Sequence, residues 1–456
     1  MIKIKLSKKA VVYGLPKKVA KSIKDNMTVM NPVWLENHKM GRFNMKTPKW
    51  LKLFGEGKRS LSVPIGYLEE LMSILNELNL DFDIIDQTVE VSAKVKFTGK
   101  LRDYQIPAFQ AMLDYNRGTL EAVTGGGKTI IGIAWMCDIQ QKTLILVHTK
   151  NLLEQWRERL LEFTDLQPAE IGQMGAGKKC IGRRVTIAMV QTWYKVSHEH
   201  KDTFGAVICD ECHRVSSRTF SEGVTAIRPK YALGLSATTF RRDTLTNFIF
   251  WFIGPKRFII DKHTLADEGR ILLPEVIMRE TDFVPMCDPT AEYTTMIKEL
   301  THDTARNALI CSDMASFKES GDLCLALSDR KSHCESLALM LQSDHGINAA
   351  VLTGDMSASD QETVIRQMND KKIQYVCATG QLIGEGFDCK ELNNLFVVTP
   401  IRFAGRLIQY IGRIMRTAKG KKRPVVYDYV DWQVQLLGRS ARHRIKVYGQ
   451  DNVTFK

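Results

Sequence analysis

The sequence predicts an α/β fold, with two parallel-sheet lobes in tandem preceded by a small basic α+β domain. From about residue 97, short apolar strands alternate with helical segments, which is typical of a parallel sheet covered by helices on both faces. The alternation stops near residue 240 and resumes near residue 323, so we expect two lobes. The expected limits are 1–95 for the basic domain, 96–255 for the first lobe, 256–310 for a helical bridge and 311–456 for the second lobe.

The first of these parts differs from the rest in its charge. Residues 1–60 hold 15 Lys or Arg against three Asp or Glu, a difference of +12, and the whole chain has a net charge of +13. Trp34, Phe43, Trp50 and Phe54 lie among these basic residues. Such a module is typical of a domain that binds a polyanion, although a merely solvated surface has the same composition. The candidate nucleic-acid contacts here are Arg42, Lys46 and Lys49.

Composition and length place the chain among globular proteins. Of its 456 residues, 44% are apolar and 25% are charged, which is ordinary for a folded domain. No apolar run approaches the length that spans a bilayer, and the basic N-terminus lacks the apolar stretch of a signal peptide. Ten scattered cysteines fit free thiols in a reducing compartment. We therefore expect a cytoplasmic protein, in the host cell if a phage encodes it, without a membrane partner.

The strands expected in the two lobes follow from short apolar runs. In the first lobe they are Thr119–Val123, Lys142–His148, Val185–Val190, Ala206–Cys209 and Ala232–Ser236. In the second lobe they are Leu323–Ser328, Ala349–Leu352, Tyr375–Ala378, Leu395–Thr399 and Val425–Tyr429. In the basic domain, Asp81–Val91 alternates apolar and polar residues as an edge strand does. Phe248 to Phe252 form an aromatic cluster, which we interpret as core rather than as a strand-separating pin.

A glycine-rich loop follows the first strand of the first lobe and opens a helix. It reads Ala-Val-Thr-Gly-Gly-Gly-Lys-Thr over residues 122–129, with Ala122 where the usual phosphate-loop pattern has glycine. Backbone N–H groups of such a loop can surround phosphate oxygens. Lys128 can reach the β- and γ-phosphates, and the Thr129 hydroxyl can bind Mg²⁺. The expected nucleotide contacts are Thr124, Gly125, Gly126, Gly127, Lys128 and Thr129.

Two adjacent carboxylates end another apolar strand of the same lobe. Asp210 and Glu211 follow Ala206–Cys209, and paired carboxylates are costly at such a place without a cation. An exposed acidic turn is the alternative, but it does not account for the phosphate loop upstream. We therefore expect Asp210 to bind Mg²⁺ and Glu211 to deprotonate the attacking water. Together the two elements indicate hydrolysis of a nucleoside triphosphate, with ATP and Mg²⁺ as cofactors.

With these residues placed, the chain from about residue 97 to its end resembles a superfamily 2 helicase, whose two lobes are RecA-like. The motifs that carry the resemblance stand in the family's order: Tyr104-Gln105, Ala122–Thr129, Val147–Lys150, Gln191-Thr192, Asp210–His213, Ser236–Thr238, Thr353-Gly354, Thr379, Gly384–Asp388 and Gln409–Arg416. The resemblance implies that Gln105 recognises adenine. It also implies contacts to a nucleic-acid backbone from Thr149, Lys150, Thr192, Thr353 and Thr379.

For the second lobe, the resemblance implies a further part of the nucleotide site. Gly386 and Asp388 are expected to bind the nucleotide, Asp388 at the ribose. Gln409, Arg413 and Arg416 match the pattern Q-x-x-G-R-x-x-R, in which arginines stabilise charge on the departing γ-phosphate. Their spacing of i and i+3 predicts that the two arginines share one face of a helix.

Within the superfamily, the resemblance extends to the xeroderma pigmentosum group B helicase branch and to the phage branch-migration helicases. It rests on Ser236-Ala237-Thr238 followed by Arg241-Arg242-Asp243, and more loosely on the loop-rich stretch from residue 31 to residue 50. It implies an ATP-dependent DNA helicase or translocase that unwinds or branch-migrates forked and junction DNA in replication, recombination or repair. We expect a monomer that contacts the DNA backbone. An RNA helicase, a duplex-DNA translocase subunit of a larger assembly and a binding module with a degenerate ATPase remain as alternatives.

Overall fold

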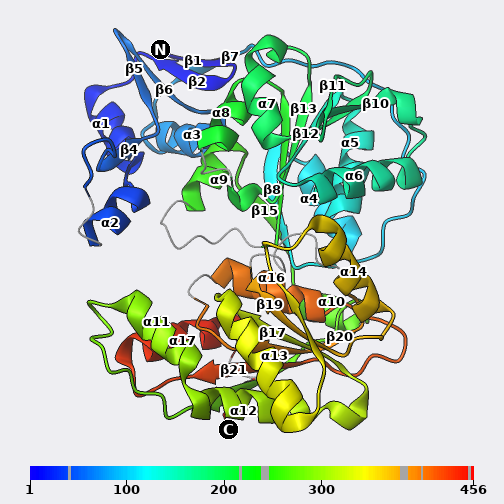
Figure 1. Ribbon diagram of the computed structural model, residues 1–456. Helices are drawn as coiled ribbons and strands as arrows, with labels where there is room; N and C mark the ends of the chain where they lie inside the picture. The colour runs from blue at the N-terminus through cyan, green and yellow to red at the C-terminus, as the bar shows by residue number, and fades with distance from the viewer. Residues whose placement is uncertain are drawn as a thin grey trace. The chain divides into compact units, whose positions relative to one another are not determined.

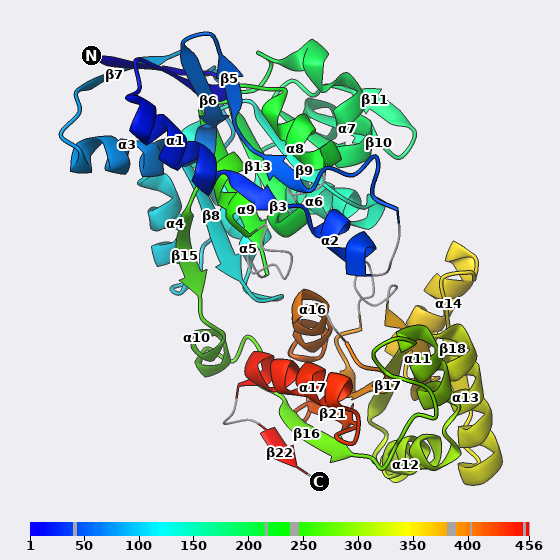
Figure 2. The same ribbon diagram turned by 90° about the vertical axis from the view of Figure 1, so that its left-hand side faces the viewer.

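The computed structural model describes residues 1–39, 43–214, 218–237, 246–380, 389–401, 404–449 and 453–455 (Figures 1 and 2). The chain divides into two compact units, one formed by residues 1–122 and 127–260 and the other by residues 123–126 and 261–456. The described residues form a five-stranded and an eight-stranded sheet in the first unit, a seven-stranded sheet in the second, and a small two-stranded ribbon. Among the described residues, no helix is both long and apolar enough to cross a membrane.

The N-terminal sheet has the strand order β5-β6-β2-β1-β7. Its strands are β1 (Ile2–Leu6), β2 (Lys9–Tyr13), β5 (Gly55–Gly57), β6 (Ser60–Pro64) and β7 (Phe82–Asp86). The helices of this domain are α1 (Lys17–Asn26), α2 (Pro32–Lys39) and α3 (Leu68–Glu77). Strands β3 (Thr28–Met30) and β4 (Trp50–Lys52) pair with each other as a separate ribbon. In β1, Ile2, Ile4 and Leu6 are buried while Lys3 and Lys5 are exposed, so one face of the sheet carries the core.

The eight-stranded sheet has the order β11-β10-β12-β9-β13-β14-β8-β15, and every pairing except β10 with β11 is parallel. Its strands are β8 (Arg117–Ala122), β9 (Thr143–Val147), β10 (Ile171–Gly175), β11 (Lys178–Cys180), β12 (Val185–Met189), β13 (Ala206–Asp210), β14 (Tyr231–Ser236) and β15 (Lys256–Ile260). The helices are α4 (Gln105–Leu113), α5 (Lys128–Ile139), α6 (Lys150–Phe163), α7 (Val190–Val196), α8 (Arg218–Thr225) and α9 (Thr246–Phe252). Figure 1 shows α7 on one side of the sheet and α5 and α6 on the other. All five residues of β9 are buried because helices cover both faces.

The aromatic cluster of α9 joins the N-terminal sheet to this lobe. Trp251 is 4% exposed and belongs to the apolar core of the N-terminal sheet. Its ring meets that of Tyr67 edge-on at 5.9 Å between centroids, and its Nε1–H donates to Glu70 Oε2 over 3.3 Å. Phe248 is also buried. The interpretation of these aromatics as core is therefore confirmed for Phe248 and Trp251.

The seven-stranded sheet of the second unit is parallel throughout, in the order β18-β19-β17-β20-β21-β16-β22. Its strands are β16 (Glu275–Glu280), β17 (Leu323–Ser328), β18 (Ala349–Leu352), β19 (Tyr375–Thr379), β20 (Leu392–Val397), β21 (Val425–Val430) and β22 (Val453–Phe455). The helices are α10 (Lys262–Asp267), α11 (Tyr293–His302), α12 (Thr304–Ala315), α13 (Lys331–His345), α14 (Ala358–Asn369), α16 (Ala404–Ile414) and α17 (Gln435–Tyr448). Short 3₁₀ helices cover Ile65–Tyr67, Pro168–Glu170, Ser197–His200, Cys212–Arg214 and Lys318–Ser320.

Three sequence-based expectations differ from these elements. The stretch expected as a helical bridge, 256–310, contains β15 of one sheet and β16 of the other besides its helices. The strand expected at residues 395–399 is β20, which runs from Leu392 to Val397 because its first residues pair with Leu323 and Cys324 of β17. The strand expected at residues 81–91 ends at Asp86, whose carboxylate turns the chain by accepting from the backbone N–H of Thr88.

Candidate nucleotide and nucleic-acid sites

The motif residues of the first lobe follow the carboxyl ends of neighbouring strands. β12, β9, β13, β14 and β8 are consecutive and parallel in the sheet, so their last residues lie along one edge. This edge carries the phosphate loop after β8, the two carboxylates at β13, and the candidate strand contacts after β9 and β12. The carboxyl edge of a parallel sheet is where ligands bind in open α/β folds.

The phosphate loop has the backbone that glycine permits. Gly125 and Gly127 have φ angles of 92° and 76°, in the left-handed region, and α5 begins directly afterwards at Lys128. A Cβ atom on Gly127 would come within 2.1 Å of Gln105 Nε2, so a larger residue would have to displace the Gln105 amide. A loop of this shape directs N–H groups toward an anion at a helix N-terminus, and it fits the phosphates of a nucleotide.

The side chain of Lys128 turns back toward the end of β8, the strand that precedes this loop. Its Nζ donates a 2.6 Å hydrogen bond to the carbonyl oxygen of Ala122. Burial lowers the pKa of Lys128, while the carboxylates of Glu211 and Asp210 oppose that shift. The ammonium group is therefore held near the loop, within the field of the two carboxylates that end β13.

Asp210 is a buried carboxylate with two hydrogen-bond donors. The indole N–H of Trp156 reaches its Oδ2 at 2.8 Å, and the backbone N–H of Glu211 reaches its Oδ1 at 2.9 Å. Burial, followed by the charge of Glu211, raises the pKa of Asp210 to about 6, and the Trp156 hydrogen bond acts against this rise. A buried carboxylate suits a divalent ion, and the oxygen donors of Asp210 and Thr129 are those that Mg²⁺ prefers.

Glu211 has a φ of 49°, an uncommon backbone conformation for a residue with a side chain. Its Oε2 lies 3.3 Å from His213 Nδ1, and the same ring nitrogen lies 3.1 Å from Ser236 Oγ at the end of β14. These contacts join the carboxylate pair to the neighbouring strand. Trp156 and His213 had no assigned role in the sequence analysis, because partners distant in sequence become visible only in the folded chain.

Gln105 lies next to the phosphate loop, but its side chain is only 3% exposed. Its Oε1 accepts a 2.9 Å hydrogen bond from the backbone N–H of Arg102. That bond fixes the amide with its Nε2 toward Gly127. Recognition of adenine by Gln105 stays a prediction.

The candidate strand contacts of the first lobe lie close together. Thr149 caps α6 by accepting from the backbone N–H of Leu152 at 3.3 Å, and the exposed Lys150 follows it. Gln191 Nε2 donates to the carbonyl oxygen of His148 at 3.5 Å, which brings the half-buried Thr192 near this helix start. The structure therefore gathers Thr149, Lys150 and Thr192 at the ends of two adjacent strands, β9 and β12.

In the second unit, Thr353 and Thr379 stand at the ends of the adjacent parallel strands β18 and β19. Thr379 is half-buried, whereas Thr353 is 3% exposed and its hydroxyl donates to Asp355 Oδ1. Thr353 can therefore contact a nucleic-acid strand only through its backbone. The exposed neighbours Gly354 and Asp355 can contact a strand directly.

The expectation that Arg413 and Arg416 share a helix face is wrong. Gln409 and Arg413 lie on α16 and are half-buried, but α16 ends at Ile414. Arg416 instead forms an antiparallel bridge with Ile271, and the backbone N–H of Leu272 donates to the Met415 carbonyl oxygen at 2.7 Å. Pairing with the 271–272 segment thus takes the chain out of the helix before Arg416.

Other expected residues lie outside the described part of the chain. They are Arg42, Thr238, Arg241, Arg242, Asp243 and the stretch that contains Gly386 and Asp388. Lys46 and Lys49 are described, and both are exposed.

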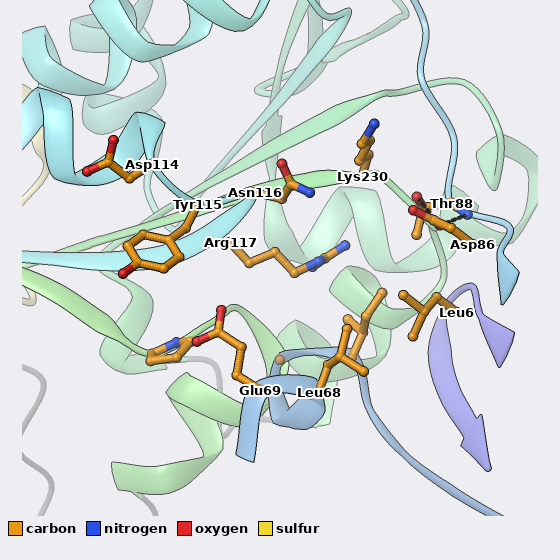
Figure 3. A pocket seen from close by; sticks show the side chains of 13 residues that line it. Leu6, Leu68, Glu69, Asp86, Thr88, Asp114, Tyr115, Asn116, Arg117 and Lys230 are labelled. Atoms are coloured by element: carbon orange, nitrogen blue, oxygen red, sulfur yellow. Dashed lines mark hydrogen bonds between the residues drawn. The ribbon is translucent and has the colours of Figure 1, made fainter. Parts of the chain in front are cut away.

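A separate pocket of about 300 Å³ lies at the other end of β8 from the phosphate loop (Figure 3). It is lined by residues of the N-terminal sheet, such as Leu6 and Asp86, and of the first lobe, such as Arg117 and Lys230. Figure 3 shows the Arg117 side chain extending toward the side where Asp86 and Thr88 lie. Arg117 donates to the carbonyl oxygen of Pro229, and burial lowers the pKa of its guanidinium to about 10. The lining of this pocket comes from six separate segments of the chain, so no local sequence pattern marks it.

Comparison with known proteins agrees with this arrangement. Residues 98–241 match the family described as type III restriction enzyme, res subunit, and residues 299–418 match the helicase conserved C-terminal domain. The chain is 25% identical over 429 residues to the protein named helicase 161L of Invertebrate iridescent virus 6, covering 89% of this chain and 93% of that protein.

Two further relatives differ in the nucleic acid that their names state. The protein named ATP-dependent RNA helicase L396 of Acanthamoeba polyphaga mimivirus is 25% identical over 442 residues, covering 90% of this chain and 78% of that protein. The protein named DNA 3′-5′ helicase Rad25 of Haloarcula marismortui is 27% identical over 356 residues, covering 75% and 55%.

Among solved structures, S. cerevisiae Dbp5 bound to RNA and ADP BeF3 has a TM-score of 0.56 and 14% identity, covering 78% of this chain and 90% of that one. This likeness concerns the fold alone, which consists of two RecA-like parallel-sheet lobes. Both lobes match helicase-type families, and viral and Rad25 helicases are among the relatives. The chain therefore belongs to superfamily 2 of the helicases.

Proposed function

We propose that this protein is an ATP-dependent DNA helicase or translocase that acts on forked and junction DNA in replication, recombination or repair. The observation that carries the proposal is the single sheet edge of the first lobe. It places the phosphate loop, the carboxylate pair and the candidate strand contacts at the ends of adjacent strands. A nucleotide at one part of this edge can therefore influence a strand at the other part.

The proposed hydrolysis assigns a task to each residue at this edge. Lys128 binds the β- and γ-phosphates. To do so, its Nζ releases the hydrogen bond to the Ala122 carbonyl oxygen and donates to a phosphate oxygen instead. Thr129 and Asp210 hold Mg²⁺, which neutralises negative charge on the phosphates when bound. Glu211 accepts the proton of the attacking water, and His213, 3.3 Å from its Oε2, orients that carboxylate.

The second lobe completes this proposal with positive charge. We assign Arg413 and Arg416 to stabilising the charge that develops on the γ-phosphate, and Gln409 to the same catalytic group. Arg413 lies on α16, whereas Arg416 lies beyond the end of this helix and pairs with Ile271. We expect Gly386 and Asp388 to bind the nucleotide as well.

The proposal of DNA as the partner has two supports. The N-terminal 60 residues carry an excess of 12 positive charges, which favours a polyanion, and one relative is named a DNA helicase. An RNA helicase is the second candidate, since another relative is named one and backbone contacts do not distinguish the two sugars. A duplex-DNA translocase subunit is a third. We place the activity in the cytoplasm, with the chain as a monomer.

Strand separation tests the proposal directly. A Y-shaped DNA fork with one labelled strand is incubated with the protein and ATP, and the released strand is measured. We expect release with ATP and Mg²⁺, and none with Lys128→Ala. A protein that hydrolyses ATP with duplex DNA but releases no strand is a translocase rather than a helicase. Release from an RNA fork alone contradicts the choice of DNA.

A further inference from the structure

The ribbon of β3 and β4 holds a loop of the N-terminal domain in a fixed shape. The backbone N–H of Asn31 donates to the Lys49 carbonyl oxygen at 2.9 Å, and Asn31 Nδ2 donates to the Pro48 carbonyl oxygen at 2.8 Å. Asn44 Nδ2 donates to the Trp34 carbonyl oxygen at 3.0 Å. These bonds tie the loop from residue 43 to residue 49 to both the ribbon and α2.

Three aromatic side chains lie in this loop or in the elements on either side of it: Phe43 in the loop, Trp34 on α2 and Trp50 on β4. Phe43 is 84% exposed and Trp50 is 47% exposed. Trp34 is half-buried and stacks on His38, with 4.8 Å between ring centroids and 17° between ring planes. Aromatic side chains usually serve the core, so rings held at the surface by a tied loop suggest a ligand.

A lysine side chain lies over two of these rings. Lys49 Nζ lies 5.2 Å from the centroid of the Trp34 ring and 5.7 Å from that of the Trp50 ring. Lys46 is exposed on the same loop. Within the described part of the chain, neither lysine forms an ion pair with a carboxylate. Positive charge interleaved with aromatic rings disfavours an apolar partner and is complementary to a ligand with anionic groups and flat π-systems.

We propose that Trp34, Phe43 and Trp50, with Lys46 and Lys49, form a platform on which unpaired bases of a DNA strand stack. The inference deepens the proposed function and rests on it for the choice of DNA. The exposed Phe43 and Trp50 rings offer faces to bases, Trp34 supports the loop through its stack on His38, and the lysines bind phosphates. Because every base has a π-face, this contact does not depend on sequence, which suits an enzyme acting at forks of any sequence.

The test is the affinity of the full-length protein for a labelled 12-nucleotide oligo-dT, measured by fluorescence anisotropy without ATP. In the double variant Phe43→Ala/Trp50→Ala we expect the affinity to fall about tenfold or more, since each stacked base contributes strongly. We expect the affinity for a 12-base-pair duplex to change less than twofold. Trp34 is left intact because it is half-buried and supports the loop.

Tyr13→Ala is the matched control. Tyr13 is 39% exposed in the same domain and has Lys5 Nζ 5.9 Å from its ring centroid, but it stands apart from the loop on β2. We expect oligo-dT affinity to be unchanged in this variant. Equal losses in the control and the double variant contradict a defined platform.

Besides equal losses in the control, three results overturn the inference: an unchanged oligo-dT affinity, an equal loss for single strand and duplex, or a loss for oligo-U RNA alone. Binding is measured without turnover, so the inference and the proposed function can fail separately. If wild-type protein shows DNA-stimulated ATPase and the double variant keeps its affinity, only the platform is wrong. If the variant loses oligo-dT affinity but wild-type ATPase ignores DNA, only the proposed function is wrong.

Discussion

The indole N–H of Trp156 donates a 2.8 Å hydrogen bond to Oδ2 of Asp210, and both side chains are buried. Trp156 lies on α6, whose N-cap is Thr149. Seven residues, about two helical turns, separate a candidate strand contact from a side chain that holds the candidate Mg²⁺ ligand. A shift of α6 on strand binding would therefore act on Asp210.

Trp156→Phe keeps most of the ring but removes this donor. The pKa of Asp210, already raised to about 6, should rise further because the hydrogen bond stabilises its charged form. We expect the acidic limb of the pH–rate profile to move to higher pH and the Mg²⁺ requirement to rise about tenfold. Trp193→Phe is the control, since that buried indole donates to the Gly223 carbonyl oxygen instead. An unchanged Mg²⁺ titration of ATPase in Trp156→Phe would rule out this role.

Glu211→Gln should lower kcat for ATP hydrolysis by about 10²- to 10⁴-fold, because an amide cannot accept the proton of water. Binding of a labelled ATP analogue should stay within about threefold of wild type. The exposed Glu199→Gln serves as the control. Normal turnover in Glu211→Gln would refute its assignment as the base.

Arg413→Ala should reduce kcat by about 10³- to 10⁵-fold, the range for arginines that stabilise a transferring phosphoryl group. Arg439→Ala, an exposed arginine on α17, should leave kcat unchanged. Single-turnover hydrolysis with excess enzyme separates this chemical step from nucleotide binding. If Arg413→Ala changes only KM, the side chain binds nucleotide without acting in the transition state.

The side chain of Lys421 caps the C-terminal end of α16, the helix that carries Arg413. Its Nζ donates to the carbonyl oxygens of Lys390, Ile414 and Arg416 at 2.7–2.8 Å. Lys421→Met leaves these acceptors without that donor, so we expect a loss of about 1–3 kcal/mol in the free energy of unfolding. The exposed Lys419→Met is the control. A stability equal to wild type in urea would contradict the capping role.

The same lysine gives a pH dependence. Burial lowers the pKa of Lys421 from its ordinary 10.5 to about 8. Between these values the unfolded chain binds more protons than the folded one, so this group's contribution to stability rises with pH. The cost of burying the ammonium is present in full below about pH 8 and is relieved as pH rises toward 10.5. The difference in free energy of unfolding between wild type and Lys421→Met, measured in urea at pH 7.5 and at pH 10, should shift in favour of wild type at the higher pH, and an unchanged difference would contradict this assignment.

The sequence was sufficient to predict the two parallel-sheet lobes and the strand ends that carry the candidate nucleotide residues. Buried parallel strands read as apolar runs, and the phosphate loop and Asp210-Glu211 directly follow such runs. Local signals therefore located them. The helix expected through Arg416 was wrong because pairing with Ile271 overrides the helical spacing.

Contacts between distant segments could not be predicted from a single sequence. The partners Trp156 and Asp210 are 54 residues apart, and nothing local marks their pairing. Likewise, Trp251 belongs to the core of the N-terminal sheet although it lies on α9 of the first lobe. Removing residues 1–95 would expose this tryptophan, so point variants are better tests of the basic domain than its deletion.

The most direct test of the account is the steady-state ATPase rate with single-stranded DNA, duplex DNA, a four-way DNA junction and single-stranded RNA at equal nucleotide concentration. The account predicts stimulation by DNA, strongest with the junction, and no turnover in Lys128→Ala under any condition. Strongest stimulation by RNA would contradict the assignment to DNA. A rate that no nucleic acid changes would contradict the coupling of the nucleotide site to the strand contacts.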